Sequence, residues 1–235
     1  MNPRSPRPLP RHDFKRAAGI SMVELLVGLA VGLFIAAAGV TLMAGNLREN
    51  RSLMLESRLM QDLRTASDII TRDLRRAGYW AGAADAVQAP AGTPTAANPY
   101  MAVTPSTAPA DSVSFAFSRD ATENHNLDSN EQFGFRLRRG VIEMQLGGGN
   151  WQALTDANTV VISEFRVTPT IQVIELASQC SAACAAGDAN CPPRQQVRSL
   201  AVSIAARSSA DAAVQRSLNS SVRLRNDAIT GACPA

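Results

Sequence analysis

The hydrophobic pattern of the chain begins with a long, nearly unbroken apolar run. Residues 25–44 contain no charged side chain, and about 20 such positions are enough to cross a bilayer as one helix. Glu24 stands directly before them, inside the stretch GISMVELLVGLAVGLFI (19–35). A charge at a membrane-spanning position costs roughly 2.5–3.5 kcal/mol on insertion scales. We therefore expect the Glu24 carboxylate to have a functional role at this position.

The helical period continues beyond the apolar run. Apolar residues recur there at spacings of three and four, which predicts a helix with one buried stripe, and Arg and Asp side chains fill the other faces. The pattern indicates one helix from Ile20 to Ala77, with Gly78 as its C-terminal stop. The predicted buried stripe is Leu59, Leu63, Ala66, Ile70, Leu74 and Ala77.

After residue 80 the pattern changes. Residues 81–110 are rich in Ala, Pro, Gly and Thr and indicate a loop. Beyond them apolar and polar residues alternate, which predicts strands. A long helix followed by a run of strands is typical of an α+β fold with an antiparallel sheet packed on the helix. The predicted strands lie in 111–117, 132–146 (two strands joined at Arg139-Gly140), 159–169, 198–208 and 218–227.

The basic excess of the chain belongs to its N-terminal tip. The formal net charge is +3, but residues 1–19 hold five of the 23 basic side chains and one of the 20 acidic ones, which leaves 18 basic against 19 acidic. A nucleic-acid-binding domain carries a strongly basic face, so no nucleic acid partner is expected. By the positive-inside rule, the tip stays in the cytoplasm and the C-terminal bulk lies outside.

The four cysteines lie in the last quarter of the chain, at Cys180, Cys184, Cys191 and Cys233. An even number behind an N-terminal export signal favours disulfides in an oxidising compartment. The sequence allows three pairings, and we favour one local bridge among the first three plus one bridge to Cys233. Zinc is the alternative, but structural zinc sites use closer Cys pairs, often with His.

Signs of enzyme chemistry are scarce, because the chain lacks the common nucleophile, phosphate-binding and metalloprotease motifs. One stretch, DATENHNLDSNE (120–131), spaces its oxygen side chains like a calcium loop. His125 occupies the position where such a loop needs glycine, and strands flank it, so a solvated acidic loop is the alternative. The candidate calcium ligands are Asp120, Asn124, Asn126, Asp128 and Glu131.

An ordinary secretory signal peptide is a second interpretation of the N-terminus. The basic tip, the apolar run and the small residues 36–38 fit a signal cleaved near Ala38. However, the apolar stretch continues to Ala44 and leads directly into the amphipathic helix. Cleavage before the apolar run, in contrast, would keep that helix whole.

The segment GISMVELLVGLAVGLFIAAAGV resembles the processing signal of type IV prepilins and pseudopilins. In that signal a basic leader ends in Gly, and Glu is the fifth residue of the mature chain; here these are Gly19 and Glu24, with Ile20 first. Residues 47–82, above all the ending RDLRRAGYWAG, resemble the helix end of PilW-type minor pilins. The chain departs from the pattern in having Ile20 where Phe is usual, and its leader is longer than many.

The resemblance implies three parts: a leader (1–19) that is removed, a long helix (20–78) with its transmembrane segment at 20–44, and a periplasmic or extracellular head (79–235). A prepilin peptidase would cut between Gly19 and Ile20 and methylate the new Ile20 amine, with which Glu24 would pair. The protein would be a building block without cofactor or catalysis, anchored in the inner membrane and later part of the pilus.

The implied partners are the peptidase, other minor pilins, the major pilin, the inner-membrane assembly platform and membrane lipid. PilW-type subunits help to prime pilus assembly and sit at the fibre tip, in support of twitching motility and adhesion. Two other functions stay open. One is a minor pseudopilin of a type II secretion system, and the other is a membrane-anchored or secreted periplasmic enzyme.

Overall fold

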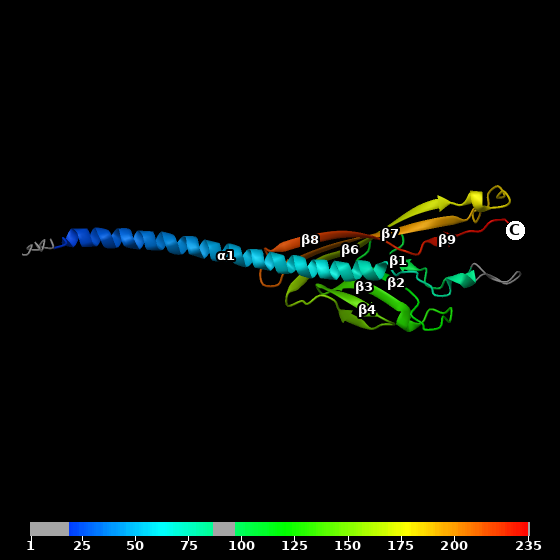
Figure 1. The fold of residues 1–235 in the computed structure, drawn as a ribbon, viewed down its shortest axis with the longest axis horizontal. Helices are drawn as coiled ribbons and strands as arrows, with labels where there is room; N and C mark the ends of the chain where they lie inside the picture. Colours follow the sequence, from blue (N-terminus) through cyan, green and yellow to red (C-terminus); the bar gives the residue numbers. More distant parts are fainter. Residues whose placement is uncertain (1–18, 87–96, 235) are drawn as a thin grey trace, which may run out of the picture. The chain divides into compact units, whose positions relative to one another are not determined.

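The computed structural model describes residues 19–86 and 97–234 (Figure 1). The leader expected at 1–19 therefore lies outside the described residues except for Gly19. The chain divides into two units between Asn50 and Arg51. We call residues 19–50 the N-terminal unit and residues 51–234 the head unit. Helix α1 (Met22–Leu74) runs through the boundary, and each unit is described by itself.

The N-terminal unit consists of three non-helical residues, 19–21, and the first part of α1, and none of its residues is buried. Its first turn begins at Ser21, whose carbonyl accepts the N–H of Leu25 at 3.1 Å. An 18-residue window of the helix has a mean hydropathy of 2.5 and none of it is buried. By length and composition, this helix is able to cross a membrane.

In the head unit, α1 buries the stripe that the sequence predicts. All six stripe residues are at most 3% exposed. The helix ends at Leu74, earlier than the expected Ala77, because the next turn tightens: Arg76 and Ala77 donate to carbonyls three residues back instead of four. Gly78 follows with a φ of +74°, which favours glycine, and donates its N–H to Ala116.

The first sheet contains five antiparallel strands in the order β1-β2-β3-β4-β5. Arg139 and Gly140, both with positive φ, form the two-residue turn between β3 and β4, as the sequence predicts. A glycine-rich turn joins β4 to β5. The strands are β1 (Val103–Thr104), β2 (Ser112–Ala116), β3 (Gln132–Arg138), β4 (Val141–Leu146) and β5 (Trp151–Ala153).

The second sheet is also antiparallel, in the order β6-β7-β8, with β9 pairing the far end of β7. Both β6 and β7 are much longer than their predicted ranges. The strands are β6 (Val160–Glu175), β7 (Arg194–Ser208), β8 (Gln215–Arg223) and β9 (Ala228–Thr230), and the short 3₁₀ helices of the chain are η1 (Ala83–Ala86), η2 (Ser129–Glu131) and η3 (Ala177–Gln179).

The predicted α+β fold is confirmed, with two sheets where the sequence suggested one. Among the described residues, backbone hydrogen bonds join them at two places: the bridge between Ala110 and Val167, and the Ile162 N–H, which donates to the Gly140 carbonyl at 2.8 Å. The chain before Ala110 contains Pro105 and Pro109, which have no N–H for a ladder, so the pairing does not extend. Part of the expected 81–110 loop, residues 87–96, lies outside the described residues.

One hydrophobic core connects the layers of the head unit. It contains the α1 stripe except Ala66, together with aromatic and aliphatic residues of both sheets. In Figure 1 the second half of α1 runs alongside both sheets. The aromatic rings pack closely, with 4.1 Å between the ring centres of Phe117 and Phe133. The aromatic core residues are Phe115, Phe117, Phe133, Phe135 and Phe165.

Candidate functional site

The predicted processing residues lie immediately before α1. Gly19, Ile20 and Ser21 are non-helical, and the helix begins at Met22. Ile20 is 72% exposed, and among the described residues, apart from the chain neighbours of Gly19, no atom lies within 4 Å of the position that a Cβ would take there. The peptide bond between Gly19 and Ile20 is therefore in exposed, non-helical backbone, the form that a protease can bind.

Glu24 lies in the first turn of α1, four residues after Ile20. A carboxylate is favoured there because the unpaired N–H groups of a helix start carry partial positive charge. Glu24 is exposed, as are the apolar side chains around it. This geometry presents the carboxylate to partners outside the chain.

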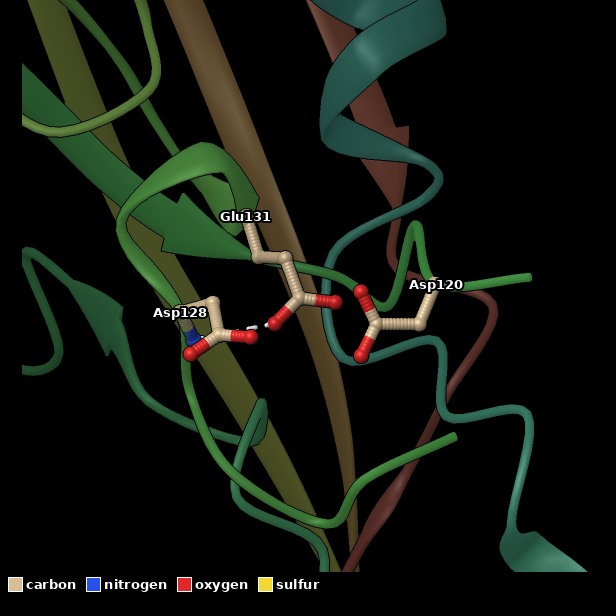
Figure 2. A group of neighbouring side chains, drawn as sticks. All are labelled: Asp120, Asp128 and Glu131. Carbon is tan, nitrogen blue, oxygen red and sulfur yellow. Dashed lines mark hydrogen bonds between the residues drawn. The ribbon is translucent and has the colours of Figure 1, made fainter. Parts of the chain in front are cut away.

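A second cluster of polar side chains lies in the loop between β2 and β3. Carboxylate oxygens of Asp120, Asp128 and Glu131 come within 4.8 Å of one another, and the three side chains point toward a common centre (Figure 2). Glu131 is fully buried. The structure therefore brings together three of the five residues that the sequence predicts as calcium ligands.

The chain itself satisfies both oxygens of Glu131. Oε1 accepts the N–H of Arg119 at 2.8 Å, and Oε2 accepts the N–H of Asp128 at 3.0 Å. The buried Tyr100 hydroxyl lies 3.2 Å from Oε1 and 3.1 Å from Oε2. Glu131 therefore has a structural role, because its carboxylate binds the backbone at both ends of the loop from 119 to 128.

The two asparagines of the calcium prediction support the loop in the same way. Asn124 Oδ1 accepts the N–H of Asn126 at 2.7 Å, while Asn124 Nδ2 donates to Asp128 at 2.8 Å. His125 between them has a φ of +60°, at the position where a calcium loop needs glycine. The loop therefore forms its turn by its own hydrogen bonds, and the calcium site stays a prediction.

The electrostatics of this loop follow from burial and from the neighbouring acids. Desolvation, with the charges of Glu131, Asp128 and Glu123, raises the pKa of Asp120. Burial alone would raise the pKa of Glu123 as well, but hydrogen bonds from Ser118, the His125 N–H and Tyr100 outweigh it and lower that pKa. Burial, together with both glutamates, raises the pKa of Tyr100, which stays a neutral donor.

Two disulfides close the end of the head unit that carries η3 and the C-terminus. Cys184 bonds to Cys191, and Cys180 bonds to Cys233. This is the layout favoured by the sequence, with one local bridge and one bridge to the tail. The second bridge attaches the C-terminal segment to the loop between β6 and β7.

Sequence reasoning missed two residues that fix this architecture. Tyr100 is fully buried and ties its own segment to Glu123 and Glu131. Arg198 donates to the carbonyls of Met101 and Asn226 at 2.6 and 2.9 Å, which joins three separate segments. Neither residue has a local signal in the sequence, since their partners are distant along the chain.

An exposed apolar helix that continues into the core of an antiparallel α+β head defines the class of pilin-like proteins. The comparison with known families places the chain within this class. It belongs to the family of prepilin peptidase-dependent protein B, whose model matches residues 52–224, well over half of the chain. No curated protein and no solved structure matches.

The matched range begins well after the predicted cleavage position. The signal at Gly19, Ile20 and Glu24 thus lies outside it. The family match and the N-terminal signal are two separate observations, and both indicate a prepilin-processed, membrane-anchored, pilin-like protein.

Proposed function

We propose that this protein is a minor pilin of PilW type in a type IV pilus. A membrane prepilin peptidase cuts between Gly19 and Ile20 and methylates the new amine. Helix α1 anchors the mature chain in the inner membrane, with the head unit on the periplasmic side. The subunit then joins other minor pilins, helps to prime assembly on the inner-membrane platform and enters the fibre near its tip, in support of twitching motility and adhesion. Its role is structural, without catalysis.

The position of Glu24 carries this proposal. Cleavage creates a cation at Ile20, four residues before a carboxylate that lies exposed at the start of an apolar helix. One isolated charge in lipid or in an apolar fibre core is costly, and a paired charge is far less so. When the amine belongs to the neighbouring subunit, the pair fixes one axial stagger, because other staggers leave both charges unpaired.

The substitution Glu24→Val tests this role in cells that assemble the fibre. Removing one partner of a buried ion pair costs about 3–5 kcal/mol, so surface fibres should fall by more than about tenfold. Cleavage after Gly19 should persist, since the peptide bond itself is unchanged. Glu49→Val is the matched control, because Glu49 is an exposed carboxylate of the same helix outside the apolar run. Normal fibre numbers with Glu24→Val would refute the pairing role.

A minor pseudopilin of a type II secretion system is the second candidate, because prepilin-peptidase dependence fits it equally well. Deletion of the gene separates the two. A minor pilin predicts loss of surface fibres and twitching with normal protein export. A pseudopilin predicts the reverse, with exported proteins retained in the periplasm.

A further inference from the structure

The end of α1 and the end of β8 border one cleft in the head unit. Its volume is about 500 Å³. Among the described residues, six line this cleft; three of them are arginines and none is acidic. Arg75 follows the last residue of α1, Arg223 is the last residue of β8, and Arg225 lies in the bend after it. We call these three exposed residues the arginine site.

Contacts between α1 and β8 hold the arginine site together. The Ser67 hydroxyl of α1 donates to the Ser220 hydroxyl of β8 at 3.0 Å, so the helix lies along this strand. Where both elements end, the Arg225 N–H donates to the Arg75 carbonyl at 3.4 Å. The site is therefore built from two elements that are distant in sequence and fixed to each other.

The positive charge of the arginine site is only partly balanced within the chain. Arg223 pairs with Asp227 at 3.1 Å. Within the described part of the chain, neither Arg75 nor Arg225 has a carboxylate oxygen within 4 Å. A cleft lined by charges of one sign raises the local concentration of ions of the opposite sign. The cleft therefore has an excess of positive charge that an anionic group would neutralise.

The helix dipole accounts for one of the three arginines. A cation is favoured at a helix C-terminus, because the last carbonyls carry partial negative charge, and this explains Arg75. Arg76 lies at the same helix end, but its guanidinium stacks 4.0 Å from the ring centre of Phe117. Arg223 and Arg225 come from the β8 side, where the dipole of α1 gives no reason for an arginine.

The backbone beside the arginine site also has unused hydrogen-bonding groups. Strand β8 lies at the end of its sheet and pairs with β7 on one edge. The Leu224 N–H donates to the Arg198 carbonyl on that edge, so by alternation Ser221 and Arg223 direct their N–H and C=O groups to the other edge. Among the described residues, no backbone group bonds to them there. An extended segment is able to pair with this edge.

We propose that the arginine site binds an extended, acidic segment of a neighbouring protein subunit. Carboxylates of that segment bind the guanidinium groups, which match carboxylate geometry, while its main chain pairs with the open edge of β8. Two different surfaces meet in this contact, so it requires no two-fold axis, and both subunits can keep their anchors in one membrane. That the partner is a subunit of the same fibre rests on the proposed function, whereas binding of an acidic strand does not.

A nucleic acid fits this surface less well than an acidic segment. Outside residues 1–19 the chain has 18 basic and 19 acidic side chains. Duplex DNA is bound by a basic face that neutralises many phosphates, whereas the positive charge here is confined to one cleft with three arginines.

Binding of a fluorescent peptide to the full-length chain in a non-ionic detergent tests the proposal. The probe is a peptide of alternating threonine and glutamate, and the control peptide has glutamine in place of every glutamate. The glutamate peptide should bind at least about tenfold more tightly, and added salt should weaken its binding. Equal binding of the two peptides, or binding of neither, would overturn the proposal.

The substitutions Arg75→Glu and Arg225→Glu locate the binding on the protein. Each reverses an exposed charge, so each should weaken binding of the glutamate peptide by at least about tenfold, while thermal unfolding shows that the variant is folded. Arg207→Glu is the matched control, because Arg207 is exposed and pairs with Gln215 at the opposite end of β8. It should bind the peptide like the wild type. An equal loss in Arg207→Glu would show a general attraction of charges and refute the site.

Two further probes test the strand pairing and the class of ligand. A glutamate peptide with N-methyl groups on alternate residues has lost the donors that pair with β8, and it should bind at least about fivefold more weakly. Unchanged binding would contradict the pairing. A DNA duplex that bound more tightly than the glutamate peptide would assign the site to nucleic acid and also overturn the proposal.

Discussion

At the scale of single residues, Glu131 does most to order the loop between β2 and β3. It is fully buried, and each of its oxygens accepts a backbone N–H as well as lying near Tyr100. A buried carboxylate is stable in such a place only because donors surround it. The acids that look like a metal site in the sequence are therefore also the residues that fold their own loop.

The substitution Glu131→Gln should destabilise the head unit by about 1–3 kcal/mol. The amide nitrogen of Gln would lie opposite a backbone N–H, and because both groups are donors, that N–H would have no acceptor. Glu143→Gln is the control. Glu143 pairs with Arg136 at 2.7 Å near the surface, where an ion pair contributes about 1 kcal/mol or less. Both effects can be measured by thermal unfolding followed by tryptophan fluorescence, since Trp80 and Trp151 both lie in the head unit. Equal stability of wild type and Glu131→Gln would contradict the structural role of the carboxylate.

At the scale of elements, the two disulfides differ in what they constrain. Cys180 and Cys233 are 53 residues apart in the chain, whereas Cys184 and Cys191 are seven apart. The larger loop removes more entropy from the unfolded chain, so by chain-entropy arithmetic the two bridges contribute about 4 and about 2.5 kcal/mol. The tail bridge therefore matters more for stability.

Replacing both cysteines of each pair with serine tests this order. The variant Cys180→Ser with Cys233→Ser should melt at a lower temperature than the variant Cys184→Ser with Cys191→Ser, and both should melt below the wild type. Melting of all three in reducing agent is the control, because the differences should then shrink. An inverted order would show that the bridges act through the native structure and not through the unfolded chain.

Long periodic elements are predictable from this sequence, and short or distant pairings are not. The stripe from Leu59 to Ala77 and the Arg139-Gly140 turn are local patterns, and both are confirmed. Strands β1 and β9 have two and three residues, too few for a period to appear. The division into two sheets and the contacts of Tyr100 depend on partners far along the chain, which periodicity does not encode.

At the scale of the whole molecule, two separate observations lead to one conclusion. The head unit and its family match identify a prepilin peptidase-dependent protein, while the exposed apolar helix provides a membrane anchor by length and composition. The short signal around Gly19 connects them, because cleavage there leaves α1 intact from its first turn. A signal peptidase that cut near Ala38 would instead remove the anchor.

Mass spectrometry of the mature N-terminus, on protein purified from its own cell envelope, tests this account most directly. We predict a chain that begins at Ile20 and carries one methyl group on its α-amine, with Glu24 as its fifth residue. Cells without the prepilin peptidase should retain the leader. A mature chain that begins near Gly39 would contradict the account, because the protein would then be an ordinary secreted protein without its helix anchor.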